Sequence, residues 1–201
     1  FVIELIQGQT LAEALASGPL AVTDVAAVGA AIARALVEVH GHGLIHCDIK
    51  PQNIVLSLSG PARLIDFGLA GRLRARSSAV VGTIDYSAPE QAGMLKRPLD
   101  ARSDLYSLGV VLFEAATGSK PFYAKTAAEV AHRHATVPPP DPRELNTAIS
   151  AELATIVLEL LAKDPDNLSY AEAMLKAANA AGYKETTRWI ADLVFRANNA
   201  A

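Results

Sequence analysis

The sequence predicts a mainly α-helical fold with one small β-hairpin, which makes it α+β overall. Alanine occurs 38 times in 201 residues, whereas aromatic residues make up only 5% of the chain. This composition favours closely packed helices over a β-sandwich. Apolar residues recur at helical spacing along most of the chain, and the clearest strand-turn-strand pattern lies at 54–65.

The N-terminal part is expected to hold a strand and two helices. Residues 1–6 form a strand-like apolar run. Thr10 and Glu13 match the capping-box pattern that begins a helix, and this short helix should end at the Ser-Gly-Pro that follows. A longer helix begins near Thr23, keeps its apolar residues on one face and has Gly41 as its predicted C-terminal cap.

The stretch at 44–98 changes in character. Two short apolar runs, 54–58 and 62–65, flank a Ser-Gly-Pro turn and predict the hairpin. Residues 71–98 show little periodicity and are expected to form a long loop. Loops of that length inside a compact domain are usually functional or mobile.

The second half of the chain is expected to be helical. A helix at 103–118 carries apolar residues on all sides, so it should be buried at the centre of the fold. Further helices are predicted at 126–135, 150–163, 169–181 and about 185–197. The first and third of these four begin with capping-box patterns.

Composition and charge exclude several classes of protein. A net charge of −3 and an isoelectric point near 6.0 give no basic excess, so we expect no nucleic-acid partner. The single cysteine rules out a disulfide framework within the chain. No apolar run approaches the roughly 18 to 20 residues that span a bilayer, so we expect no membrane segment within this chain. We expect a cytoplasmic protein, with any membrane tether supplied by segments outside this sequence.

Four polar side chains flank the predicted hairpin and should converge, because a hairpin brings its two ends together. They are Asp48, Lys50 and Asn53 before it and Asp66 after it. Asn53 and Asp66 offer the hard oxygen ligands that Mg²⁺ prefers beside substrate phosphates. Lys50 can neutralise charge on a phosphoryl group, and Asp48 can accept the proton of an attacking hydroxyl.

The order and spacing of these residues resemble those of a known family. The patterns H-x-D-x-K-P-x-N at 46–53, D-F-G at 66–68 and A-P-E at 88–90 are similar to those in the C-terminal lobe of eukaryotic-type (Hanks-type) serine/threonine protein kinases. Lys50, and Thr83 within G-T-I-D-Y, resemble the serine/threonine branch rather than the tyrosine branch.

The resemblance extends along most of the chain. Residues 100–109 resemble the start of the family's central helix, and the Pro-rich link at 138–140 with L-A-K-D-P at 161–165 resembles bacterial members. The resemblance covers residues 1–181 and implies a partial kinase domain made of the hinge and the C-terminal lobe. Residues 182–201 are interpreted as a trailing amphipathic helix or linker.

The resemblance implies a serine/threonine kinase that transfers the γ-phosphoryl group of Mg-ATP to protein hydroxyls. Asp48 would be the catalytic base and Lys50 the phosphate contact. Asn53 and Asp66 would be the metal ligands. The implied cofactors are ATP and Mg²⁺, and the implied partners are protein substrates.

The resemblance also implies a nucleotide site. Glu4 and Ile6 would be hinge residues that offer a backbone carbonyl and amide to the adenine edge, with Ile3 as gatekeeper. Val55 would lie beneath the adenine ring, and Gln52 would be a further nucleotide contact.

Two further features are implied by the resemblance. Residues 69–87 would form the activation segment, with Ser77, Ser78 and Thr83 as candidate phosphoacceptors. For the two serines, a plain solvated loop is an equally acceptable interpretation. Asp104 would anchor the backbone of the catalytic loop from the central helix.

Two positions depart from the family pattern. Cys47 stands where phosphorylation-regulated members have Arg, so no guanidinium can clamp a phosphorylated loop residue. We therefore expect that loop phosphorylation is not needed, and that Cys47 is a packed small side chain rather than a reactive thiol. Leu168 stands where the family has the Arg partner of Glu90, so Glu90 should pair elsewhere or leave the lobe less stable.

The family's mostly β N-terminal lobe, with its Gly-rich loop, strand Lys and helix Glu, is not found in the sequence. We expect this lobe to be the missing partner of the chain, and the isolated chain to bind ATP weakly and to be inactive. The alternatives are a pseudokinase or scaffold lobe that acts by protein binding, and a non-kinase helical adaptor that leaves the ordered motifs unexplained.

Two histidine pairs could suggest metal sites, but each has a simpler interpretation. His40 and His42 have no third ligand nearby and are expected at a helix end and in a loop. His132 and His134 lie two residues apart on a predicted helix, so they should point to different faces.

Overall fold

The computed structural model describes residues 6–68, 70–72 and 84–163. The predictions for Ile3, Glu4, Ser77, Ser78, Thr83, Leu168 and the helices at 169–181 and 185–197 lie outside the described residues. The described helices are α1 (Leu11–Leu15), α2 (Val22–Gly41), α3 (Ala101–Thr117), α4 (Ala127–Thr136) and α5 (Ala151–Leu160). Short 3₁₀ turns lie at Pro51–Asn53, Ile84–Tyr86 and Pro142–Glu144.

The strands are short and form two small antiparallel sheets. They are β1 (Gly8–Thr10), β2 (Leu44–Ile45), β3 (Ile54–Ser57), β4 (Arg63–Leu64) and β5 (Gly71–Arg72). One sheet has the order β1-β3-β4, and the other pairs β2 with β5. The mainly helical fold with a small hairpin is therefore confirmed, because β3 and β4 are the two strands predicted at 54–58 and 62–65.

Three strands, β1, β2 and β5, are not predicted by the sequence, because each is too short to show a period of its own. Strand β1 pairs with the other edge of β3, with Gly8 opposite Ser57. A Cβ atom at Gly8 would lie 2.1 Å from the carbonyl oxygen of Leu56, so glycine permits this close approach. Strand β5 pairs with β2 and occupies the start of the expected loop at 71–98.

Helix α2 begins close to the predicted residue, but its predicted cap is wrong by one position, because the C-cap residue is His42. Gly41 remains helical, and Gly43 is the residue with a positive φ of 69°. The amide of His42 still bonds to the carbonyls of Glu38 and Val39, so the helical turn closes later than the sequence suggests. Gly43 then takes the left-handed conformation that glycine adopts readily.

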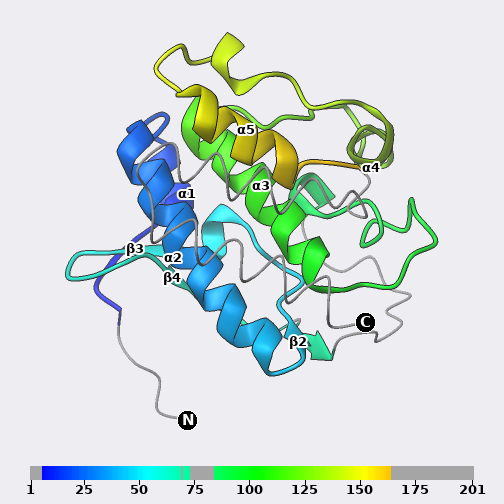
Figure 1. The fold of residues 1–201 in the computed structure, drawn as a ribbon, viewed down its shortest axis with the longest axis horizontal. Helices are drawn as coiled ribbons and strands as arrows, with labels where there is room; N and C mark the ends of the chain where they lie inside the picture. Colours follow the sequence, from blue (N-terminus) through cyan, green and yellow to red (C-terminus); the bar gives the residue numbers. More distant parts are fainter. Residues whose placement is uncertain (1–5, 69, 73–83, 164–201) are drawn as a thin grey trace.

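Helix α3 lies at the centre of the fold, as its apolar sequence predicts (Figure 1). It contacts both α2 and α5, and nearly all its residues are buried. It begins at Ala101, two residues before the predicted start, because the Asp100 side chain caps it by accepting the amide of Arg102. It ends where Gly118 adopts a φ of 74°.

The close contact between α3 and α5 depends on a residue without a side chain. A Cβ atom at Gly109 would lie 2.6 Å from the Cβ atom of Leu160, which is closer than side chains can pack. Helix α5 itself is capped by the hydroxyl of Ser150, which accepts the amide of Leu153. It is shorter than predicted, ending at Leu160, and Leu161 follows it as the C-cap residue.

Helix α4 is joined to α3 through a buried histidine. Its predicted capping box, Thr126 with Glu129, is present. His134 is fully buried, with Nδ1 2.9 Å from the Tyr106 hydroxyl and Nε2 3.1 Å from the Asp85 carbonyl oxygen. Nε2–H donates to that carbonyl, so Nδ1 accepts from Tyr106. His132 is exposed, which confirms that the pair faces opposite ways.

Burial shifts the pKa of His134 and of Glu159 in this half of the molecule. It lowers the pKa of His134 to about 4, with a smaller contribution in the same direction from the Lys163 charge and opposing contributions from Asp85. Burial also raises the pKa of Glu159 to about 7. Its Oε2 atom is buried and has no hydrogen-bond partner within the described part of the chain. Both groups therefore favour the neutral form.

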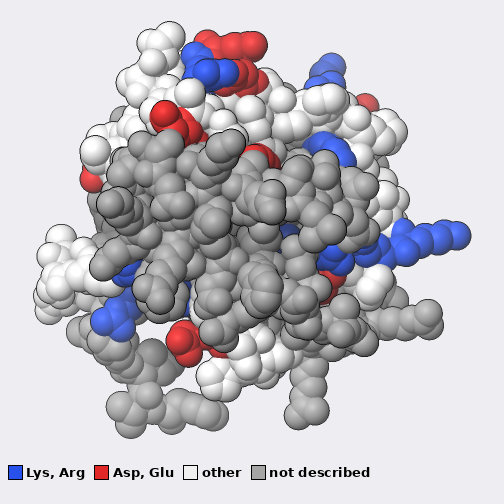
Figure 2. All heavy atoms as spheres, in the orientation of Figure 1, with Lys and Arg blue, Asp and Glu red and all other residues white. Residues whose placement is uncertain are grey.

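Charges of both signs are mixed on the surface. Around the rim of the face in Figure 2, described Lys and Arg side chains lie close to described Asp and Glu side chains. None of the described helices combines the length and apolar character that crossing a membrane requires.

The contact at Gly109 gives a stability prediction. Gly109→Ala should lower the free energy of unfolding by about 1–3 kcal/mol, because the new methyl group overpacks the α3–α5 contact. Gly41→Ala is the matched control, since a Cβ atom added at the exposed end of α2 would meet nothing within 4 Å. Urea denaturation measures both variants. Equal stability of the two would contradict the packing argument.

The buried titratable groups give opposite pH predictions. His134 binds its proton more weakly in the folded protein than in the unfolded chain, so its contribution to stability is present above pH 6.5 and lost towards pH 4. Protonation of His134 should therefore lower the free energy of unfolding by about 2 kcal/mol between pH 7 and pH 5. Glu159 has a raised pKa, so its contribution is present below pH 4.5 and lost as the pH rises through 7.

Urea denaturation at pH 7 and pH 5 separates these two contributions. His134→Gln should lose less stability on acidification than the parent protein, and Glu159→Gln should lose more. The same acid dependence in the parent and both variants would show that neither group changes its pKa on folding.

Candidate active site

The loop between β2 and β3 brings together three of the predicted site residues. Asp48 is only 9% exposed. Its Oδ2 atom lies 2.6 Å from Nζ of Lys50 and accepts a hydrogen bond from Nδ2 of Asn53 at 2.9 Å. The same Nδ2 group also donates to the backbone carbonyl of Asp48 at 2.8 Å. The carboxylate is therefore fixed in one orientation by a cation and an amide.

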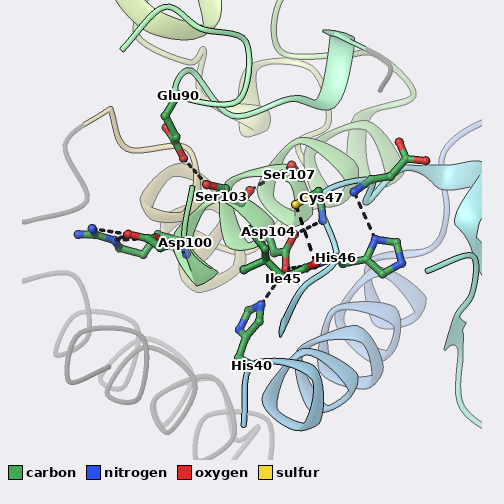
Figure 3. A network of polar contacts seen from close by, with 11 residues as sticks. His40, Ile45, His46, Cys47, Glu90, Asp100, Ser103, Asp104 and Ser107 are labelled. Atoms are coloured by element: carbon green, nitrogen blue, oxygen red, sulfur yellow. Dashed lines mark hydrogen bonds and ion pairs between the residues drawn. The ribbon is translucent and has the colours of Figure 1, made fainter. Parts of the chain in front are cut away.

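The backbone of this loop is held by a carboxylate on α3 (Figure 3). Asp104, which is 1% exposed, accepts the amide of His46 through Oδ2 and the amide of Cys47 through Oδ1, each at 2.9 Å. Nε2 of His40 lies 2.8 Å from Oδ2. These contacts agree with the expectation that Asp104 anchors the backbone of the catalytic loop.

Cys47 adopts a strained backbone conformation, with a φ of 65°. For a residue with a side chain this left-handed conformation costs about 1–2 kcal/mol, so surrounding contacts must stabilise it. The bond from its amide to Asp104 is one such contact. Its carbonyl oxygen accepts a second, from Nε2 of Gln91.

The hairpin places the second loop beside the first, as the sequence predicts. The amide of Ile65 donates to the carbonyl of Asn53 at 2.9 Å, and Nε2 of His46 lies 3.2 Å from the Ile65 carbonyl. Asp66 follows directly, with a φ of 62° and its Oδ1 atom accepting the amide of Gly68. Its side chain is exposed, and the bond from Ile65 to Asn53 places the backbone just before it beside the loop that carries Asp48.

The predicted nucleotide residues lie around the three-stranded sheet. Val55 is in β3 opposite Thr10 of β1 and is 9% exposed. Ile6 is half-buried and precedes β1, and Gln52 is exposed in the 3₁₀ turn before β3. Of the predicted set, Ile3 and Glu4 are outside the described residues. The structure therefore places the described residues of this set on adjoining segments.

Glu90 has a partner other than the absent arginine. Its Oε1 atom accepts a hydrogen bond from the hydroxyl of Ser103 in the first turn of α3, at 2.6 Å (Figure 3). This confirms that Glu90 pairs elsewhere. Nearby, the Asp100 carboxylate binds the guanidinium of Arg102 at 2.6 Å, so the start of α3 is rich in polar contacts.

A second polar cluster lies on the side of α3 that faces the 3₁₀ turn at Ile84–Tyr86. The Tyr86 hydroxyl donates to the Glu114 carboxylate at 2.7 Å. Burial, and then this carboxylate, raise the pKa of Tyr86 above its ordinary value. Nζ of Lys120 lies 2.5 Å from Oδ2 of Asp85. These bonds hold the turn near the end of the expected activation segment.

Sequence reasoning misses three residues of the site: His40, Gln91 and Ser103. The sequence places His40 at a helix end, because nothing in it links this residue to one 64 positions away. Gln91 follows the A-P-E pattern directly, but its bond to Cys47 spans 44 positions. The only signal for Gln91 in the sequence is that it follows the A-P-E pattern, and this position does not tell which residue its side chain contacts.

Comparison with known proteins agrees with this geometry. The protein kinase domain family matches residues 1–178. The chain is 38% identical over 183 residues to the serine/threonine-protein kinase PknB of Mycolicibacterium smegmatis, covering 88% of this chain and 29% of that protein. It is 44% identical over 165 residues to the DNA damage-responsive serine/threonine-protein kinase RqkA of Deinococcus radiodurans, covering 80% of this chain and 24% of that protein.

A PknB from Mycobacterium tuberculosis is 37% identical over 183 residues, covering 88% of this chain and 29% of that protein. The chain thus spans less than a third of the length of these curated relatives. The family match, however, extends over most of the chain and includes the loops that carry Asp48 and Asp66. The chain therefore belongs to the protein kinase family, in its bacterial Hanks-type serine/threonine branch.

Proposed function

We propose that this chain carries the catalytic loop of a protein kinase that transfers the γ-phosphoryl group of Mg-ATP to Ser or Thr hydroxyls of proteins. The observation that carries the proposal is the buried Asp48 carboxylate, fixed through one oxygen by Lys50 and Asn53. A general base must be held in a defined orientation near the hydroxyl that it deprotonates. Both contacts serve that requirement.

Asp48 and Lys50 have complementary roles in the proposal. Asp48 orients the substrate hydroxyl and accepts its proton. Lys50 places a positive charge 2.6 Å from this carboxylate, where it can also neutralise charge that develops on a transferred phosphoryl group. The buried position of Asp48 strengthens such electrostatic interactions, because the local dielectric is lower than that of water.

The donor chemistry of Asn53 and Asp66 fits a magnesium ion. Nδ2 of Asn53 is committed to Asp48, so its amide oxygen is the atom that can face a cation. Asp66 adds an exposed carboxylate. Across the described residues, no group of three or more His, Cys, Asp or Glu side chains could hold a metal. One carboxylate and one amide are typical of Mg²⁺ sites that share the ion with substrate phosphates. When bound, Mg-ATP supplies the transferable phosphoryl group.

The nucleotide contacts belong to the same proposal. Ile6 and Val55 lie on neighbouring segments, since β1 follows Ile6 and pairs with β3. We assign them, with Glu4 and Gln52, to the nucleotide site. The family's N-terminal lobe would supply the remaining phosphate contacts, so binding should be measured on the full-length protein. The proposed partners are protein substrates, because their Ser or Thr hydroxyls receive the transferred phosphoryl group.

A second candidate function is a lobe that acts by protein binding alone. Cys47 is the observation in its favour, because a position that is commonly Arg in regulated kinases has lost its charge. The retained contacts among Asp48, Lys50 and Asn53 favour catalysis instead. The two functions differ in whether the protein transfers phosphate.

Substitution at the two aspartates tests the catalytic proposal. In a Mg-ATP phosphotransfer assay on the full-length protein, Asp48→Asn should lower kcat by about 10²–10⁴-fold, the usual contribution of a general base. Asp66→Ala should also lower kcat strongly, and the two losses should not add, because the residues act on one step. Asp24→Asn, an exposed residue of α2, is the matched control. Equal activity of parent and variants, or none in any, would remove support for these roles.

Phosphatase treatment tests the consequence of Cys47. With no guanidinium at this position to bind a phosphorylated residue, dephosphorylation of the full-length protein should change kcat by less than about twofold, a smaller effect than the loss of one hydrogen bond. Mass spectrometry would confirm that phosphate has been removed. An inactive enzyme after treatment, restored by rephosphorylation, would contradict the prediction.

A further inference from the structure

The peptide group that joins Cys47 to Asp48 is held at both of its polar ends. Its carbonyl oxygen accepts a hydrogen bond from Nε2 of Gln91. Its N–H group, which belongs to Asp48, donates to Nδ1 of His46 at 3.3 Å. The preceding peptide group is held by Asp104, which accepts the amide of Cys47. Two successive peptide planes before the Asp48 side chain are therefore fixed.

This restraint matters because Cys47 has a left-handed backbone, with a φ of 65°. A non-glycine residue is strained in this conformation and tends to relax when its contacts are removed. Relaxation means rotation about the N–Cα bond of Cys47, and because Asp104 holds the preceding peptide, this rotation would swing the Cys47 carbonyl and displace the Asp48 carboxylate from Lys50 and Asn53. The bond from Gln91 opposes that rotation directly.

Gln91 is itself held in a rigid turn. The amides of Ala92, Gly93 and Met94 bond back to the carbonyls of Ala88, Glu90 and Pro89, at 2.9–3.1 Å. The Glu90 side chain accepts the hydroxyl of Ser103 on α3, the helix that also provides Asp104. The two groups that fix the catalytic loop, Gln91 and Asp104, are thus fixed relative to each other.

We propose that Gln91 is a positioning residue of this enzyme: its side-chain amide holds the Cys47 carbonyl and thereby sets the orientation of Asp48. The inference rests on the proposed role of Asp48 as the base. In this proposal the neutral side-chain amide of Gln91 joins the turn after Glu90 to the catalytic loop. Because this link carries no charge, it operates without a phosphorylated residue.

Two substitutions in the full-length protein test the donor role of Gln91. Gln91→Met keeps the length of the side chain but removes the donor. It should lower kcat by about five- to tenfold, the effect of losing one hydrogen bond. KM for ATP and for the protein substrate should stay within about twofold, because no contact with either substrate is changed. Unchanged kcat in Gln91→Met would overturn the proposal.

Gln91→Glu adds a readout that a purely structural role would not produce. At pH 8 its carboxylate would face the Cys47 carbonyl and repel it, so kcat should fall further than in Gln91→Met. The ordinary pKa of a glutamate is about 4.3, and partial burial beside the Cys47 carbonyl should raise it. As the pH is lowered towards 5.5, a growing fraction of the carboxyl groups therefore takes up a proton and can donate again. The ratio of variant to parent kcat should therefore rise in acid for Gln91→Glu and stay flat for Gln91→Met. A flat ratio for both would overturn the proposal.

The chain offers a matched control in Asn146. Its side-chain Nδ2 also donates to a backbone carbonyl, that of Ala116 at the end of α3, at 2.8 Å, but this bond does not involve the catalytic loop. Asn146→Asp should lower the melting temperature while kcat of the folded protein stays at the parent value. A kcat loss in Asn146→Asp equal to that in Gln91→Glu would overturn the specific role of Gln91.

Amide hydrogen exchange separates this inference from the proposed function. In Gln91→Met, the amides of His46 and Cys47 should exchange faster than in the parent, because the loop has lost one of its restraints. In Asn146→Asp they should exchange at the parent rate. If the parent transfers no phosphate, the proposed function fails, and exchange alone decides whether Gln91 holds the loop. Equal exchange in parent and Gln91→Met would overturn the inference.

Discussion

The catalytic loop depends on a buried carboxylate that satisfies two successive backbone amides. The Asp104 carboxylate accepts a hydrogen bond from the His46 amide on one oxygen and from the Cys47 amide on the other. Its side chain is almost completely removed from water. A buried carboxylate is favourable only when hydrogen bonds replace its lost hydration, so the loop and the carboxylate stabilise each other. These two hydrogen bonds hold Cys47 in its left-handed conformation, which an unrestrained chain would leave. They also fix the start of the segment that carries Asp48.

Asp104 can play this part because α3 is rigid and central. The helix is buried between α2 and α5 (Figure 1), and Gly109 allows α5 to approach closely. The same helix provides Ser103, which binds Glu90, and Tyr106, which binds His134 of α4. One helix therefore positions the catalytic loop, the turn after Glu90 and α4. A displacement of α3 would disturb all three together.

Local sequence patterns are reliable where the cause of the structure is itself local. The capping box of Thr10 with Glu13 can be identified because its partners lie within one helical turn. The hairpin can be identified for a similar reason, since its strands are separated by a short turn. The predicted C-terminal cap of α2, Gly41, is wrong, because Gly41 and Gly43 offer equal local signals. Which of them leaves the helix depends on where the chain must enter β2.

The sequence by itself determined the mainly helical class, the order of the helices and the family to which the catalytic motifs point. Those properties depend on residue type and spacing, which can be taken directly from the sequence. Tertiary structure alone decided that Gln91 and His40 contact the catalytic-loop network, and that Glu90 pairs with Ser103. Such contacts join residues many positions apart, and they exist only after α3 is buried and the loops have closed around it. A hydrogen bond of that kind leaves no periodic trace in the sequence.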